Sequence, residues 1–80
     1  MQNDTQQRVK KVISNVLKIE QDQIADDANF IFDLGADSMQ SMELVASFEE
    51  EFDIKMDEEK ALEVQNVSDA VEFISGYLDN

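Results

Sequence analysis

Apolar residues recur at helical spacing along most of this chain, and no stretch alternates in the way that a half-buried strand requires. The first apolar stripe predicts a helix over residues 4–18, and it comprises Val9, Val12, Ile13, Val16 and Leu17. The last stripe predicts a helix after the cap residue Asn66, and it comprises Val67, Ala70, Val71, Ile74 and Leu78. The absence of proline leaves these helices uninterrupted.

The middle of the chain predicts a second helix from Asp37 to about Phe52. Asp37 is a favourable N-cap, and Gln40 stands where it completes a capping box. One face of this helix is apolar and comprises Leu44, Val45, Phe48 and Phe52. The opposite face comprises Met39, Met42, Glu43, Ala46 and Glu50. Because one apolar face is enough to dock a helix on a core, the two methionines on the other face are candidates for contact with a partner.

A long connection without helical period spans residues 19–36. We expect Phe30, Phe32 and Leu34 to fold back over the core and to order this loop. Gly35 then provides a tight turn before the second helix. A short helix is expected around residues 60–64, opened by three acidic residues that favour its N-terminus. The predicted fold is a single all-α domain over residues 1–80, a small four-helix bundle with three longer helices and one short one.

Charge and composition exclude several functions. Lys and Arg number 6 and Asp and Glu number 19 among 80 residues, which gives a net charge of −13. Such a surface repels nucleic acid and anionic membranes, so the expected partner is a protein with a basic patch. The chain has no Cys and no His, which removes thiolate and imidazole chemistry, and an enzyme is not expected. No apolar run is long enough to span a membrane. We expect the protein to be cytoplasmic and monomeric.

The sequence gives little support for metal binding or for acid–base catalysis. Asp33 and Asp37 flank Gly35, but the spacing of a dedicated calcium loop is absent, so no metal site is predicted. With this many acids, neighbouring carboxylates carry no information about catalysis. Ser38 is the stronger candidate, because its hydroxyl stands at the start of a helix, where a phosphate ester is well tolerated. Met39, Met42 and Glu43 lie on the exposed face beside it.

This central region resembles the acyl carrier protein family. The resemblance is carried by DLGADSM over residues 33–39, MELV over 42–45 and FEEEFDI over 48–54, and it extends weakly to VxxAVxxI over 67–74. It implies that a phosphopantetheinyl transferase (holo-carrier synthase) attaches 4′-phosphopantetheine from coenzyme A to Ser38, which Asp37 flanks as the helix cap. The thiol of that arm would carry acyl groups as thioesters, which fits a chain without cysteine.

The resemblance also implies two further sets of residues. The face that acyl-processing enzymes with basic docking patches would read comprises Met39, Met42, Glu43, Ala46, Glu49 and Glu50. The lining of an acyl-chain pocket would comprise Leu44, Phe48, Phe52, Ala61, Leu62 and Ala70. The implied function is to shuttle acyl intermediates between enzymes of fatty-acid or related lipid biosynthesis.

Two alternatives stay open from the sequence. One is a specialised carrier of polyketide or aminoacyl cargo, which loading assays would separate from a fatty-acid carrier. The other is an unmodified acidic adaptor that docks partner helices through Met39 and Met42, because methionine is an adaptable contact residue. The mass of the native protein separates the adaptor from either carrier.

Overall fold

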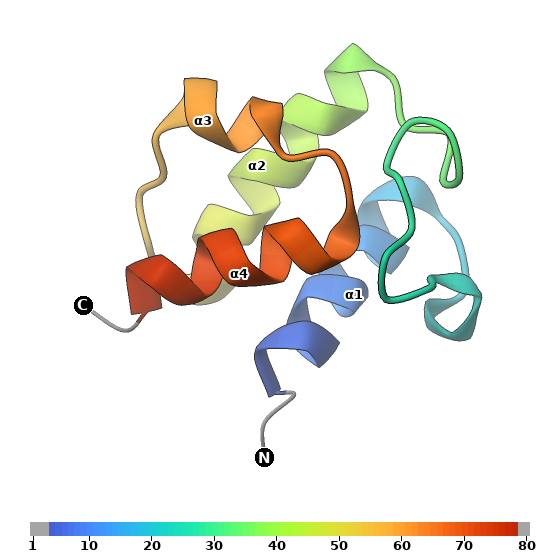
Figure 1. Cartoon of the computed structure of the whole chain (residues 1–80), viewed down its shortest axis with the longest axis horizontal. Coiled ribbons are helices and arrows are strands. Elements are labelled where there is room, and N and C mark those ends of the chain that lie inside the picture. The colour runs from blue at the N-terminus through green and yellow to red at the C-terminus, as the bar shows by residue number, and fades with distance from the viewer. Residues whose placement is uncertain (1–3, 79–80) are drawn as a thin grey trace.

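The computed structural model describes residues 4–78, so the predicted domain of residues 1–80 extends past both ends of the described chain. The elements are α1 (Asp4–Leu17), the 3-10 turn η1 (Gln21–Gln23), α2 (Ser38–Phe52), α3 (Glu58–Glu63) and α4 (Val67–Leu78). Within residues 4–78, strand pairing is limited to an isolated bridge between Asn29 and Asn66. The all-α prediction, with three longer helices and one short helix, is confirmed (Figure 1).

The helices begin and end at residues that satisfy their free backbone groups. Asp57 caps α3 by accepting a hydrogen bond from the Lys60 backbone N–H, and the Asn66 side chain accepts one from the Asp69 backbone N–H at the start of α4. α1 and α2 are followed by Lys18 and Asp53, whose φ angles are 61° and 55°. These two left-handed residues end their helices without a glycine.

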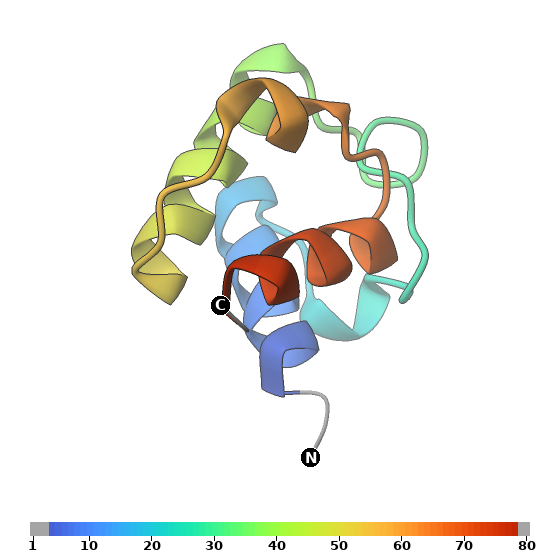
Figure 2. The same cartoon turned by 60° about the vertical axis from the view of Figure 1, so that its left-hand side comes forward.

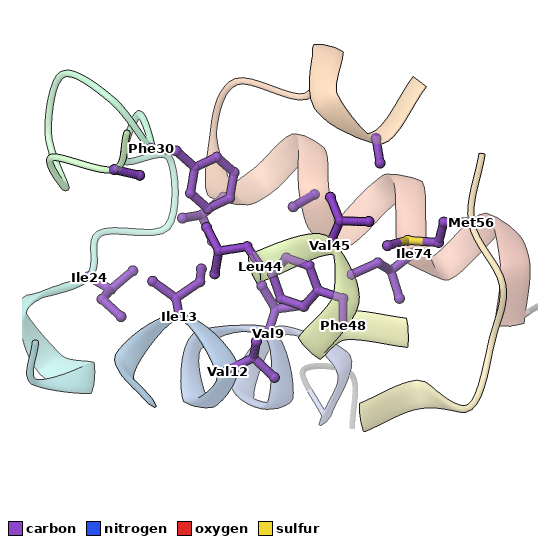
Figure 3. Close-up of a cluster of buried hydrophobic side chains, with 14 of the residues drawn as sticks. Val9, Val12, Ile13, Ile24, Phe30, Leu44, Val45, Phe48, Met56 and Ile74 are labelled. Atoms are coloured by element: carbon purple, nitrogen blue, oxygen red, sulfur yellow. The ribbon is translucent and has the colours of Figure 1, made fainter. Parts of the chain in front are cut away.

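The core is apolar throughout and lies between the four helices (Figure 3). α1 packs against both α2 and α4, and α3 lies against α2 (Figures 1 and 2). Val9, Ile13, Val67 and Ile74 are at most 1% exposed and form its centre. The predicted buried face of α2 is confirmed, and it comprises Leu44, Val45, Phe48 and Phe52.

The long loop is ordered, as expected, through backbone bonds to the start of α4. The Phe30 N–H donates to the Gln65 carbonyl, and the Val67 N–H donates to the Ala28 carbonyl, each at 2.9 Å. Ile24, Ala28 and Phe30 are buried, and Leu34 is partly buried. The loop thereby closes one end of the core.

The expectation that Phe32 covers the core is wrong, because its side chain is 87% exposed. The cause is a tight turn over residues 29–34. The Asn29 side-chain oxygen accepts hydrogen bonds from the backbone N–H groups of Ile31 and Phe32, each at 2.9 Å. The Asn29 carbonyl accepts from Asp33 and Leu34. This Asx turn buries Phe30 before the bend and leaves Ile31 and Phe32 on its outer side.

Candidate functional site

The start of α2 is fixed by local hydrogen bonds on both sides of Ser38. Gly35 has a φ of 76°, a left-handed value that favours glycine, and it turns the chain toward the helix. Ala36 is buried, and its N–H donates to the Phe30 carbonyl at 2.8 Å. These contacts hold the entry to the helix against the loop.

Asp37 and Gln40 form the predicted capping box, which is therefore confirmed. The Gln40 N–H donates to Asp37 Oδ1 at 2.8 Å, and the Asp37 N–H donates to Gln40 Oε1 at 3.2 Å. Such a cap stabilises a helix by about 1 kcal/mol. Its consequence here is a rigid first turn, so the residue inside it has a defined position.

Ser38 is the first residue of α2 and is exposed. Across residues 4–78, no hydrogen bond engages its hydroxyl. The first backbone N–H groups of a helix lack partners within the helix, and the positive end of the helix dipole lies there. A phosphate ester on this oxygen would be exposed to solvent and stabilised by both effects.

The outer face of α2 is exposed as the sequence predicts. Met39 is 76% exposed and Met42 is 52% exposed, while Glu43, Ala46 and Glu50 are also exposed. Glu49 differs from the other acids, because it is half-buried and its Oε2 accepts a hydrogen bond from the Met56 backbone N–H at 2.8 Å. That carboxylate fixes the connection between α2 and α3.

A cavity of about 310 Å³ lies between α2, α3, α4 and the turn of residues 29–34. Five of the six residues predicted for an acyl pocket line it: Leu44, Phe48, Ala61, Leu62 and Ala70. Phe52 does not line it, because its ring lies under the guanidinium of Arg8, 4.4 Å from the ring centroid. The lining also includes residues that the sequence reasoning missed, among them Phe30, Val45, Met56, Phe73 and Ile74. The apolar spacing of α2 and α4 marks Val45 and Ile74 as buried, which is the signal that could have found them.

The basic residues of α1 are partly engaged within the chain. Arg8 Nε lies 2.8 Å from Glu51 Oε2 and Lys10 Nζ lies 2.6 Å from Asp26 Oδ1. The hydrogen bond from Arg8 lowers the pKa of Glu51, and the hydrogen bond and charge of Lys10 lower the pKa of Asp26. The acids near Ser38 have no such partner among the described residues. The negative charge of this end is therefore not neutralised internally.

The part of the chain that the structure describes contains neither a cluster of metal ligands nor a membrane-spanning helix. No group of three or more metal-ligating side chains is placed to hold an ion. No helix among these residues has the length and hydrophobicity needed to cross a bilayer.

Comparison with known proteins gives the class. The family model described as "Phosphopantetheine attachment site" matches residues 7–74. The chain belongs to this family, and it is a carrier domain whose cofactor is 4′-phosphopantetheine.

A solved structure gives the fold in more detail. The chain is similar to a protein of Mycobacterium tuberculosis that is provisionally named an acyl carrier protein, with a TM-score of 0.84 and 23% sequence identity. The match covers 91% of this chain and 97% of the other. The four-helix arrangement is therefore that of an acyl carrier protein.

Proposed function

We propose that the chain is a single carrier domain over residues 1–80, a cytoplasmic monomer without catalytic activity, and that Ser38 bears its 4′-phosphopantetheine arm. The observation that carries this proposal is the geometry at the start of α2. The Ser38 hydroxyl is exposed, engaged by no other described residue, and positioned by the box of Asp37 and Gln40. Ser41 and Ser47, farther along α2, lie outside the N-terminal turn where the free N–H groups gather.

The attachment reaction needs little from the carrier itself. The Ser38 oxygen attacks the phosphorus that bears the pantetheine of coenzyme A, the phosphoanhydride bond breaks, and adenosine 3′,5′-bisphosphate leaves while the hydroxyl proton passes to a base of the transferase. The chain contributes an accessible nucleophilic oxygen and N–H groups at the helix start that favour the negative charge of the new ester. The bound arm supplies the thiol that forms thioesters.

We propose that the cargo is an acyl chain of fatty-acid or related lipid biosynthesis. The cavity supports this choice, because its wall is built largely from aliphatic and aromatic side chains such as Leu44, Phe48 and Ile74. Ser41 lines the same cavity and lies three residues after Ser38 on α2, so one edge of the cavity is about one helical turn from the attachment serine. An alkyl chain gains free energy by burial there, whereas a charged aminoacyl group does not.

Partners would read the outer face of α2. Met39, Met42 and Ala46 offer apolar contact area, and Glu43 and Glu50 supply negative charge at its edge. A transferase and acyl-processing enzymes with basic patches complement this surface. Charge steering gives fast association without high affinity, which suits a carrier that visits several enzymes in turn.

The mass of the intact protein purified from its native cell tests this function. We expect one phosphopantetheinyl group on Ser38, with part of the population carrying an acyl group that neutral hydroxylamine releases. The released hydroxamate identifies the cargo, and a polyketide or aminoacyl product would replace the fatty-acid assignment. A native protein without any adduct on Ser38 would contradict the carrier proposal and favour an unmodified adaptor.

A further inference from the structure

Two large apolar side chains project from the turn of residues 29–34 without a role in the core. Phe32 is 87% exposed and Ile31 is 59% exposed. Among the described residues, no other large apolar side chain is as exposed as Phe32. An aromatic ring left in water gains nothing for folding, so the stability of the bundle does not account for this residue.

Hydrogen bonds fix the backbone of the turn that carries these side chains. The Asn29 side-chain oxygen accepts hydrogen bonds from the backbone N–H groups of Ile31 and Phe32. The Asn29 N–H in turn donates to Asp33 Oδ2 at 2.8 Å. The Gly35 N–H also donates to the Ile31 carbonyl at 3.1 Å. A partner that binds this turn therefore loses little free energy in ordering its backbone.

The backbone of the turn is bonded to the segment that leads into α2 and Ser38. Ile31 and Phe32 line the same cavity as Ser41, which lies one helical turn after Ser38. The chain between the turn and α2 is short and is bound back to Phe30 through Ala36. The backbone of the turn that carries the apolar pair is therefore held against the segment that enters α2.

We propose that Ile31 and Phe32 are a docking contact for the phosphopantetheinyl transferase, which binds them in an apolar pocket with a basic rim. This proposal rests on the attachment at Ser38 proposed above. The enzyme that forms a bond to the Ser38 oxygen must cover the surface beside that atom, whereas an enzyme that acts on the thiol at the far end of the arm need not. The turn is part of the surface that has to be covered.

Charge complementarity selects this partner over a lipid surface. Residues 19–54 contain eleven acids and no Lys or Arg; Asp33 directly follows Phe32, and Asp37 directly precedes Ser38. An anionic membrane is repelled by this segment, while a protein pocket with a basic rim is attracted to it. Aromatic side chains surrounded by a charged rim are the usual energetic centre of such contacts.

Steady-state kinetics of modification test the proposal. The apo protein, coenzyme A, Mg²⁺ and the transferase of the same cell are mixed, and the gain of mass on the carrier is followed for the wild type, Phe32→Ser, Ile31→Ser and Phe32→Leu. We expect Phe32→Ser to lower kcat/KM about tenfold through KM, the loss typical of a truncated contact residue. Ile31→Ser should lose less, and Phe32→Leu should restore part of the rate. Leu78→Ser, 41% exposed on α4, is the matched control and should match the wild type.

The outcomes separate the two proposals. A wild-type protein that takes up no phosphopantetheine defeats the attachment at Ser38 itself. A wild-type protein that is modified, with Phe32→Ser modified at the same kcat/KM, overturns only the docking contact. A wild-type dimer in sedimentation that Phe32→Ser converts to a monomer would also overturn it, because a second copy would then cover the turn. Equal circular dichroism spectra confirm that each variant is folded.

Discussion

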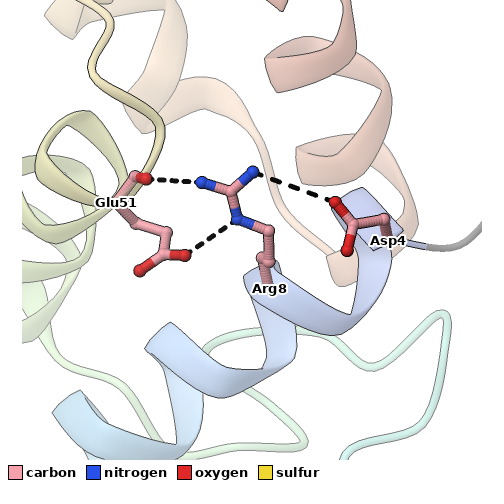
Figure 4. Close-up of polar contacts among 3 residues, drawn as sticks. All are labelled: Asp4, Arg8 and Glu51. Carbon is pink, nitrogen blue, oxygen red and sulfur yellow. Dashed lines mark hydrogen bonds and ion pairs between the residues drawn. The ribbon is translucent and has the colours of Figure 1, made fainter.

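Arg8 on α1 binds the C-terminal end of α2 through both the side chain and the main chain of Glu51 (Figure 4). Arg8 Nε donates to Glu51 Oε2 at 2.8 Å, and a terminal nitrogen donates to the Glu51 carbonyl at 2.7 Å. The guanidinium also lies over the Phe52 ring, and Asp4 lies 3.9 Å away on the other side. The helix that begins at Ser38 is therefore fixed at its far end by α1.

Removing the charge of Glu51 should make the free energy of unfolding less dependent on pH. Arg8 lowers the pKa of Glu51 from an ordinary value of 4.5, so the pair stabilises the fold above that pH and loses its effect as pH falls through the folded-state pKa. Glu51→Gln should unfold at lower urea concentration than the wild type at pH 7, and the difference between their urea midpoints should be smaller at pH 3. Glu72→Gln, exposed on α4, is the charge-matched control. An offset between Glu51→Gln and the wild type that is the same at both pH values would contradict this account.

Glu49 should act on stability rather than on partner binding. Glu49→Ala leaves the Met56 N–H without its acceptor and should cost about 1 kcal/mol of unfolding free energy, measured by urea denaturation. Glu49→Gln keeps an oxygen acceptor and should recover most of that loss. If Glu49→Gln is as unstable as Glu49→Ala, the hydrogen bond to Met56 is not the cause.

The helices were predictable from sequence because their apolar residues recur at regular helical spacing. The exposure of Phe32 and the partial burial of Glu49 were not predictable, because they depend on hydrogen bonds between side chains and the backbone. Leu44 and Phe48 follow the helical spacing and are buried as expected. Phe30 and Phe32 are the same residue type two positions apart, and only the Asx turn at Asn29 decides which of them is buried. Glu49 is half-buried for a similar reason. Its carboxylate accepts a hydrogen bond from the Met56 N–H, and this bond depends on the path of the chain between α2 and α3.

Added salt should stabilise the apo protein by screening the repulsion between its acidic side chains. The net charge is −13, and the ion pairs found among residues 4–78 involve only Arg8 and Lys10 as cations. The repulsion between the remaining acids should therefore cost more free energy than these ion pairs contribute, and salt weakens both. We expect the melting temperature to rise as NaCl increases from low ionic strength, and to rise at lower concentrations of Mg²⁺. A melting temperature that falls with salt would show that the ion pairs of α1 dominate.

Reversing charge on the outer face of α2 should slow association with basic partners. Glu43→Lys with Glu50→Lys replaces attraction by repulsion, so the association rate with an acyl-processing enzyme should fall and the deficit should shrink as salt rises. Stopped-flow binding with the holo-protein measures both effects. Glu20→Lys with Glu72→Lys is an equal charge change off this face, at residues outside α2 that are also exposed. An equal loss in this control would mean that net charge, not the face, governs recognition.

Met42→Ala should produce a different kinetic signature. The side chain is 52% exposed on the same face, and its truncation removes apolar contact area without changing charge. We expect a faster dissociation rate with little dependence on salt, measured in the same stopped-flow experiment. An effect confined to the association rate would exclude Met42 from the docked contact.

The central claim is that Ser38 bears the arm, and the mass of the Ser38→Ala protein after reaction tests it most directly. The wild-type apo protein, incubated with coenzyme A, Mg²⁺ and a phosphopantetheinyl transferase, should gain one phosphopantetheinyl group. Ser38→Ala should gain none and keep its helical circular dichroism, because Asp37 still caps α2 through Gln40. Ser41→Ala and Ser47→Ala, on the same helix, should be modified like the wild type. A phosphopantetheinyl group on the Ser38→Ala protein would contradict the assignment.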